Sequence, residues 1–305
     1  DAYWNYALAL REIEIYEQSL KLARDQYEEA AVRVEVGSLA EIDLVAARAE
    51  AALREQALIN ARATAETRRL TLLRLLHPGE SNDFWDRPVT VTDCLAAPAA
   101  DPEPRDAHIA AALRHRPDLN QARLALQSGE LDLVQTANGL LPYLEAFVTL
   151  GRTGYASSFS NSAGDILSDA SGISAGLNFR YTLGNRSESA THRQAEIKQQ
   201  QLDLALTNLQ SLAQQDVRAA WLELERARSQ VDATAASLDL QREKLRAETE
   251  KYRVGRSTIL QVNQAQRDAL QAQVDHARAL ADTAKALAAL YAAEGRLLHN
   301  QGITL

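Results

Sequence analysis

The sequence predicts a mainly α-helical protein in which long antiparallel helical hairpins are combined with one β-hairpin. Three observations lead to this fold class. All seven prolines lie between residues 78 and 142, so residues 1–76 and 186–300 lack the residue that breaks helix interiors. One stretch of sequence recurs after 218 residues. Between residues 143 and 184, apolar residues change from a helical period to strict alternation.

The recurring stretch covers residues 2–72, which align with residues 220–290 without a gap. Val36-Gly37 aligns with Val254-Gly255, and the flanking segments share further alanine, leucine and arginine positions. Solenoid repeats have periods of roughly 20–50 residues. The much longer period found in this chain indicates a duplicated half of the molecule.

Each copy of the repeat is predicted to form a helical hairpin. Residues 1–35 and 39–76 are the arms of the first hairpin, and residues 186–253 and 258–300 are the arms of the second. At ~1.5 Å per residue the arm 186–253 would extend for roughly 100 Å, a length that favours coiled-coil packing. Alanines at three- and four-residue spacing on the return arm would let the helices approach closely.

The segment between the first hairpin and the strands divides into two parts. Residues 77–104 contain most of the prolines and are predicted to be irregular, with one short strand at residues 89–92. Residues 105–142 are predicted to be mainly helical and to lead into the first strand, with a break in the stretch RHRPDL at residues 114–119.

The alternating segments predict a β-hairpin with one apolar face. Residues 143–153 and 172–184 each form a strand of about ten residues, and a serine-rich polar loop joins them. One interpretation is an amphipathic hairpin that packs on the helices of a soluble protein. The other is a membrane hairpin, which requires several copies of the chain because two strands cannot close a barrel in lipid. The apolar face carries Leu144, Ala146, Val148, Leu150, Ile173, Ala175, Leu177, Phe179 and Tyr181.

Composition excludes several classes of function. The net charge is −8 with both signs interspersed, and there is no basic tract of the kind that binds nucleic acid. The single cysteine, Cys94, excludes an internal disulfide and a cysteine-based zinc site. The six histidines are scattered, with no pair at i, i+4 spacing, so we expect no metal site. With no nucleophile–base pair and no phosphate loop, we expect neither an enzyme nor a cofactor.

No apolar run of 18 residues predicts a transmembrane helix. The sequence contains no methionine and begins within a helical pattern that has no cap. We therefore interpret the sequence as an internal piece of a longer, processed chain.

Three motifs resemble one known family along essentially the whole chain. They are RHRPDLNQARLALQSGELDLVQTANGLLPYLEAFVTLG at residues 114–151, LGNRSESATHRQAEIKQQQ at residues 183–201 and YRVGRSTILQVNQAQ at residues 252–266. The chain resembles the TolC-like outer membrane efflux family, the outer membrane factors of tripartite efflux and secretion systems.

The resemblance implies a homotrimer in the bacterial outer membrane with a long periplasmic extension. Each protomer of the family gives four strands to a shared twelve-stranded β-barrel and four helical stretches to a periplasmic α-barrel tunnel. The second strand pair of this chain is then expected upstream of residue 1. The implied function is a passive exit duct that works with a periplasmic adaptor and an inner-membrane pump. The alternative is a soluble coiled-coil scaffold without a pore, which would have no need for the hairpin at residues 143–184.

The resemblance also implies that the two glycine turns lie at the closed periplasmic end of the tunnel and dock the adaptor. The simpler interpretation is that both glycines are ordinary helix ends, for which a left-handed glycine suffices. The expected docking residues are Val36, Gly37, Ser38, Leu39, Val254, Gly255, Ser257 and Thr258.

Family gates use aspartates just beyond the turn, with a tyrosine and an arginine on neighbouring helices. In this sequence Asp43 follows the first glycine by six positions, and Gln261 stands at the equivalent place in the second copy. Glutamines thus stand where the family gate has acidic residues in the second copy. Neutral side chains at these places argue against strong cation selectivity. Ser257 takes the place of the family arginine, and Arg256 lies one position earlier. The expected gate is Asp43, Tyr252, Arg256, Gln261 and Gln264; for Asp43 and Arg256 the alternative is a solvated helix surface.

Overall fold

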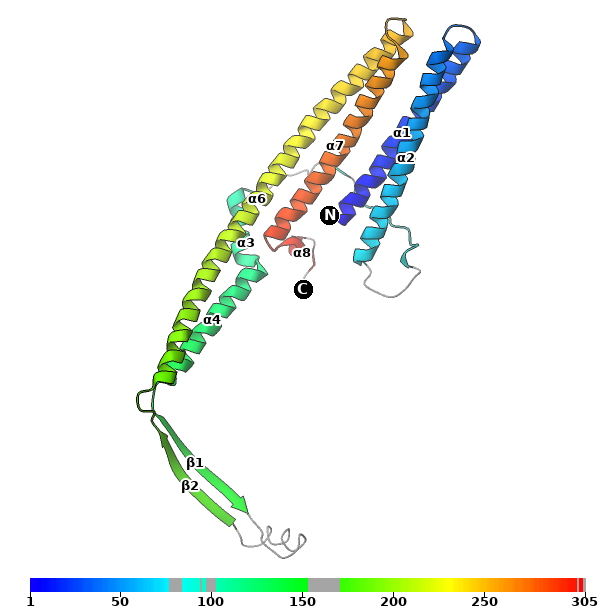
Figure 1. Ribbon diagram of the computed structural model, residues 1–305. Coiled ribbons are helices and arrows are strands. Elements are labelled where there is room, and N and C mark those ends of the chain that lie inside the picture. Colours follow the sequence, from blue (N-terminus) through cyan, green and yellow to red (C-terminus); the bar gives the residue numbers. More distant parts are fainter. Residues whose placement is uncertain (77–83, 94, 97–102, 153–170, 301, 304–305) are drawn as a thin grey trace, which may run out of the picture. The chain divides into compact units, whose positions relative to one another are not determined.

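The computed structural model describes residues 1–76, 84–93, 95–96, 103–152, 171–300 and 302–303 (Figure 1). The chain divides into two compact units. The first unit contains Asp1–Arg116 and Leu212–Leu305, and the second contains Pro117–Ser211. Helix α6 (Arg186–Arg253) contributes residues to both units.

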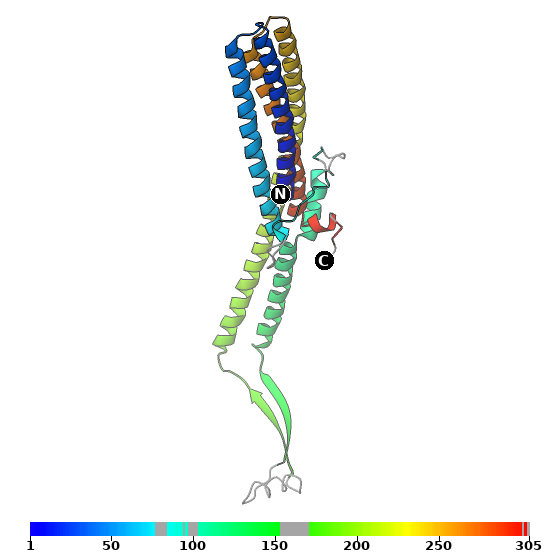
Figure 2. The same ribbon diagram turned by 90° about the vertical axis from the view of Figure 1, so that its right-hand side faces the viewer.

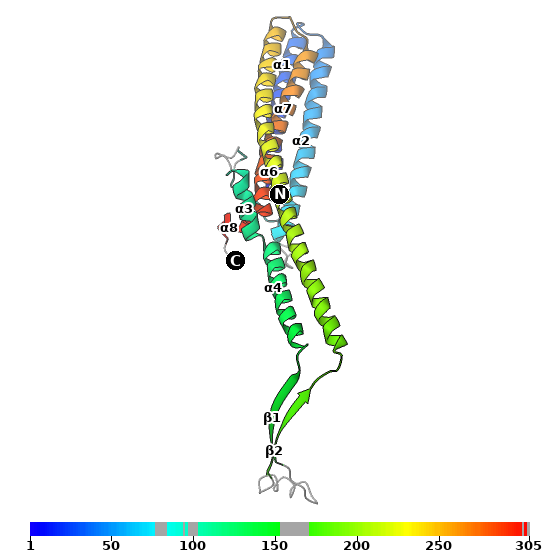
Figure 3. The same ribbon diagram turned by 90° about the vertical axis from the view of Figure 1, so that its left-hand side faces the viewer.

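The first unit is built from two helical hairpins. Helices α1 (Ala2–Glu35) and α2 (Glu41–Leu76) form the first hairpin, and the C-terminal part of α6 with α7 (Ile259–Ala293) forms the second. These elements occupy the predicted arms. The two hairpins lie side by side, and their turns are at the same end of the unit (Figures 2 and 3).

Small residues allow the helices of the first unit to pack closely. Helix α7 buries alanines along most of its length, and it contacts both α1 and α2. Leu270, Val274 and Ala277 of α7 form one buried cluster with Ile15 of α1. Alanine has the highest helix propensity and leaves room for a neighbouring helix, so the same residues favour the helix and its packing.

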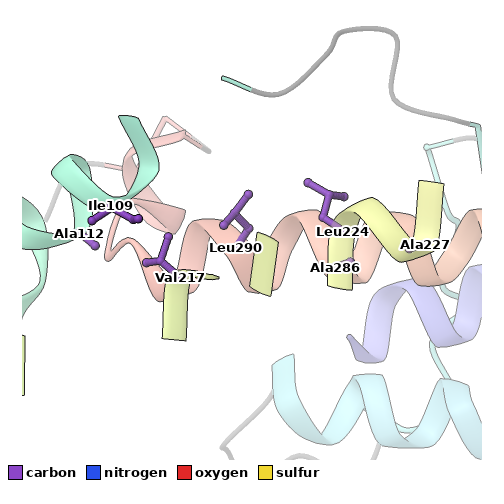
Figure 4. Packing of buried hydrophobic residues seen from close by; sticks show 7 residues of the cluster. All are labelled: Ile109, Ala112, Val217, Leu224, Ala227, Ala286 and Leu290. Carbon is purple, nitrogen blue, oxygen red and sulfur yellow. The ribbon is translucent and has the colours of Figure 1, made fainter. Parts of the chain in front are cut away.

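A second buried cluster joins three helices. Ile109 and Ala112 belong to α3 (Arg105–His115), and the remaining members belong to α6 and α7 (Figure 4). Beside this cluster the almost fully buried His108 contacts the carboxylate of Glu294 at the end of α7. These contacts fix α3 against the second hairpin. The members from α6 and α7 are Val217, Leu224, Ala227, Ala286 and Leu290.

The return arm of the second hairpin is shorter than predicted. Helix α7 ends at Ala293, and a separate turn, α8, spans Leu297–Asn300. Gly295 lies between them with a φ of +73°. A Cβ atom at this position would lie 3.1 Å from the Cα atom of Arg116. The prediction of one continuous helix over residues 258–300 was wrong because the close approach of residues 115–116 requires glycine at residue 295, and the chain turns there.

The predicted short strand at residues 89–92 is also absent from the described residues. This segment has no regular secondary structure. It is held by α1 instead, since the hydroxyl of Tyr6 donates a hydrogen bond to the carbonyl of Val89 (3.2 Å) and the hydroxyl of Tyr3 donates one to Asp93 (2.7 Å). Among the described residues no strand pairs with this segment, so it has no partner with which to form the hydrogen bonds of a β-sheet.

The second unit combines two helical segments with the β-hairpin. Helix α4 (Pro117–Asn138) follows the break at Arg116, whose extended conformation is the one favoured before a proline. Helix α4 lies close to the first part of α6, since a Cβ atom at Gly129 would be 3.0 Å from Leu202. The break predicted within residues 114–119 is therefore present.

The strands β1 (Tyr143–Arg152) and β2 (Ser171–Arg180) pair as an antiparallel hairpin. Leu144 lies opposite Phe179, and Leu150 opposite Ile173, so the predicted apolar residues within both strands share one face. On the other face Phe147 lies opposite Gly176.

The β2 strand ends earlier than the predicted residue 184, so Tyr181 lies outside it. The last pair is Tyr143 with Arg180, and the next partner would be Pro142, which has no N–H group to donate. Gly184 and Asn185 then have positive φ values of +87° and +35°, and the chain turns into α6. Thr153, the predicted end of the first strand, lies outside the described residues.

Within the described part of the chain, no helix is both long and apolar enough to span a membrane.

Candidate docking and gating site at the hairpin turns

The first turn ends α1 with a glycine in the left-handed conformation. Gly37 has a φ of +72°, and its N–H donates to the carbonyl of Val34 (2.9 Å). The N–H of Ser38 donates to the carbonyl of Arg33 (2.8 Å). This pair of bonds is the Schellman motif. A Cβ atom at Gly37 would meet nothing within 4 Å, so the backbone conformation, and not a lack of space, requires glycine.

The second turn has the same backbone. Gly255 has a φ of +75°, and its N–H donates to the carbonyl of Tyr252 (3.0 Å). The N–H of Arg256 donates to the carbonyl of Lys251 (2.8 Å). Each bond corresponds to one in the first turn, as expected for two copies of one unit.

Side chains reinforce the second turn. Thr258 caps α7 in a capping box: its hydroxyl accepts from the N–H of Gln261, whose side chain accepts from the N–H of Thr258 (both 3.4 Å). Gln261 thus has a local role at the start of α7.

A carboxylate also takes part in the second turn. Glu248 accepts hydrogen bonds from Lys251 (2.6 Å) and from the hydroxyl of Ser257 (2.8 Å). The bond from Lys251, followed by the bond from Ser257, lowers the pKa of the Glu248 carboxyl. Ser257, which replaces the expected arginine, therefore joins the end of α6 to the turn.

The first turn lacks these side-chain contacts. Ala40 precedes α2 at the position equivalent to Thr258, and it has no side-chain oxygen with which to cap a helix. The N–H of Asp43 donates to the carbonyl of Ala40 (3.0 Å). Within the described residues the half-buried side chain of Asp43 makes no hydrogen bond or ion pair.

Tyr252 connects the two hairpins beside the turns. The guanidinium of Arg33 lies over its ring, 5.8 Å from the ring centre, in a cation–π contact. A groove of about 180 Å³ lies beside this contact, between α1, the end of α6 and the start of α7. Its walls include Leu22, Ala30, Arg33, Tyr252, Ile259 and Val262.

Gln264 belongs to a polar network further along α7. It donates to Asp268 (2.7 Å), which also accepts a hydrogen bond from Lys244 of α6 (2.7 Å). The bond from Lys244, followed by the bond from Gln264, lowers the pKa of the Asp268 carboxyl. Among the described residues, no hydrogen bond joins Gln264 to Asp43. Sequence reasoning missed Asp268 and Lys244, because their pairing joins residues 24 positions apart on two different helices.

The residues predicted to dock an adaptor are mostly exposed. Val36 and Val254 are apolar yet 70% and 68% exposed. Gly37, Ser38, Gly255 and Thr258 are also exposed, while Leu39 and Ser257 are half-buried. Arg256 is exposed, and its side chain makes no ion pair with the described residues.

The apolar face of the β-hairpin is exposed as well. Leu150 and Ile173 are each 73% exposed, and Leu177 is 74% exposed. The interpretation in which this face packs on the chain's own helices therefore does not hold for the described residues.

Comparison with known proteins identifies relatives of one kind. The family model "Outer membrane efflux protein" matches residues 108–296. The curated outer membrane efflux protein BepC of Brucella suis biovar 1 (strain 1330) is 28% identical over 287 residues, which cover 93% of this chain and 59% of BepC. The chain thus spans less than two thirds of the length of this relative.

Solved structures share the fold. The outer membrane protein VceC of Vibrio cholerae superposes with a TM-score of 0.75 at 18% identity, over 96% of this chain and 68% of VceC. The open state of the MtrE outer membrane channel of Neisseria gonorrhoeae superposes with a TM-score of 0.73 at 22% identity, over 97% of this chain and 65% of MtrE.

Proposed function

The chain belongs to the outer membrane efflux protein family, and on this premise we propose that it forms part of a passive exit duct through the outer membrane and periplasm. The observation that carries the proposal is the β-hairpin, whose apolar face is exposed along both strands. Strands of ten residues that alternate in polarity fit an outer-membrane barrel.

The duct is a homotrimer in this proposal. Every backbone group in lipid needs a hydrogen-bond partner, so two strands must join others to close a barrel. Three copies that give four strands each would form a shared twelve-stranded barrel, with a helical tunnel in the periplasm. The second strand pair of each copy would come from outside residues 1–305.

The gate is proposed at the end of the tunnel that carries the two glycine turns. Asp43 is the central residue, because its carboxylate has no partner among the described residues and can accept hydrogen bonds from a neighbouring copy. Tyr252 and Arg256 are its proposed donors. Gln261 and Gln264 replace acidic groups with neutral amides, so the gate is not strongly cation-selective.

The same end is proposed to receive a periplasmic adaptor that links the duct to an inner-membrane pump. The exposed Val36 and Val254 give this surface an apolar component. Energy for export would come from the pump, since the duct itself performs no chemistry. A coiled-coil scaffold without a pore is not favoured, because it leaves the exposed apolar strand face without a role.

The gate is tested by Asp43→Ala combined with Tyr252→Phe in the full-length protein. We expect a higher closed-state conductance in planar lipid bilayers, because the proposed hydrogen bonds at the constriction are lost. Asp203→Ala is the control, since it removes one exposed carboxylate from α6 in the second unit, far along the chain from either turn. Unchanged conductance in the double variant would overturn the gate assignment. Failure of both the parent and the double variant to conduct would overturn the duct itself.

A further inference from the structure

A chain of hydrogen bonds continues from Gln264 across to the first hairpin. Arg267 of α7 donates to Gln264 (2.9 Å) and also to Glu50 of α2 (2.8 Å). With the bonds among Gln264, Asp268 and Lys244, the network joins α2, α7 and α6 within the first unit. Arg267 is the member that connects the two hairpins.

Glu50 is buried, and its charge depends on arginine. The residue is only 5% exposed, and neighbouring Arg54 on the same helix is 8% exposed. The Arg54 guanidinium forms an ion pair with Oε1 of Glu50 from the same helix (2.5 Å). The partner from the other hairpin is Arg267, which donates to Oε2 of Glu50 (2.8 Å) and whose side chain is 38% exposed. Removing one of two arginines from a buried carboxylate leaves its charge less well compensated, which is destabilising.

The duplication gives the same acidic position two different roles. Glu50 and Asp268 are equivalent residues, each thirteen positions beyond its turn glycine. Asp268 is bound by Lys244 from the other arm of its own hairpin. Glu50 is paired with Arg54 of its own helix and is also bound by Arg267 from the opposite hairpin. One acid therefore holds a hairpin together, while its counterpart holds two hairpins to each other.

We infer that Arg267 and Glu50 form a latch between the hairpins, and that Asp268 and Lys244 form a clip within the second hairpin. The turn ends can separate only when the latch opens, whereas the clip keeps α6 and α7 together as one body. The Arg267 side chain is partly exposed to water, whereas Glu50 is almost fully buried. The latch therefore opens by movement of the arginine. The latch itself does not depend on the proposed duct; only its consequence for export rests on that proposal. In the duct, opening of the latch precedes widening of the periplasmic end.

The distance between the turns tests the latch directly. Spin labels are attached to Ser38→Cys and Val254→Cys in the full-length protein, with Cys94→Ala, and distances are measured by pulsed electron paramagnetic resonance. Glu50→Gln and Arg267→Gln should each raise the ratio of long to short distances by about tenfold or more, because a buried hydrogen-bonded charge pair is broken. The double variant should not exceed the single variants, since the bond between Glu50 and Arg267 is already lost in each of them.

Asp268→Asn is the matched control, because it weakens an equivalent acid that binds within one hairpin. Its distance distribution should match that of the parent. The latch is refuted if Glu50→Gln and Arg267→Gln keep the parental distribution, or if Asp268→Asn changes it equally. Arg267→Lys keeps the positive charge, so it is the variant least expected to misfold. Its ratio of long to short distances should lie between those of the parent and of Arg267→Gln. A parent that forms no pore in bilayers would refute the duct but leave the distance result valid.

Discussion

The two hairpin turns share one backbone but differ in their side chains. Both end the outgoing helix with a left-handed glycine and the same two hydrogen bonds. Only the second turn adds a capping box at Thr258 and a bond from Ser257 to Glu248. In the first turn Ala40 cannot cap α2, and Asp43 has no described side-chain partner.

The difference shows which part of a duplicated unit is free to diverge. Glycine is required in both copies because the turn needs a positive φ. The side chains around it only set how firmly the return helix is held. We therefore expect the second turn to be the rigid one and the first to adjust to a neighbouring copy or to an adaptor.

The largest effect should come from replacing either glycine with valine. A β-branched residue at positive φ is strongly disfavoured, by about 2 kcal/mol. Because both sites have open space for a Cβ atom, Gly37→Val and Gly255→Val should lower the free energy of unfolding by similar amounts. Denaturant unfolding of the purified protein measures this, with alanine variants giving about half the cost. Clearly unequal losses would show that the turns differ in backbone as well as in side chains.

Removing or adding a helix cap should change the stability of the two turns in opposite directions. Thr258→Ala removes the cap of α7 and should cost about 1 kcal/mol of stability. The reverse change, Ala40→Thr, supplies a capping hydroxyl before α2 and should gain up to about 1 kcal/mol. Thermal unfolding of both variants and of the exchanged pair measures the two effects. A loss of stability in Ala40→Thr would show that another feature prevents capping at the first turn.

Acid should loosen the second turn selectively. The pKa of Glu248 is lowered in the folded protein by Lys251 first and by Ser257 next. Its stabilising effect is therefore complete above the pKa of an unfolded glutamate, about 4.3, and is lost as the pH falls through the lower folded value. Ala30 occupies the equivalent position before the first turn and cannot titrate. Hydrogen exchange at pH 6 and pH 3.5, corrected for intrinsic rates, should show lost protection at residues 255–261 and little change at residues 37–43.

The smallest effect is expected from Ser257→Ala. Loss of the weaker of the two bonds should raise the pKa of Glu248 slightly towards its ordinary value, whereas Lys251→Ala should raise it further. Carboxyl titration followed by nuclear magnetic resonance distinguishes the two variants. An equal or larger shift in the serine variant would reverse the assigned order of the two bonds.

The sequence was sufficient for features that depend on local pattern. The proline-free arms, the glycines of the turns and the alternating strand residues each follow from the spacing of one residue type. The capping box at Thr258 and Gln261 also fits this class, since a hydroxyl three positions before an amide is visible in the sequence. It was overlooked because a family gate was expected at Gln261.

Features that depend on contacts between distant segments could not be predicted in this way. Gly295 ends α7 because residues 115–116 lie against it, and β2 ends where Pro142 would be its partner. Likewise, nothing in the local sequence shows that Glu50 is buried against Arg267, which is 217 positions away. Each depends on a pairing between segments that no local periodicity encodes.

The pair of Phe147 and Gly176 in the β-hairpin has an evolutionary consequence. A Cβ atom at residue 176 would lie 2.7 Å from the Phe147 ring, which covers the glycine from the opposite strand. The two positions are therefore expected to vary together among descendants of this gene: where the aromatic ring is kept, only glycine is tolerated across from it, and where the ring is lost, a larger residue can take the vacated space.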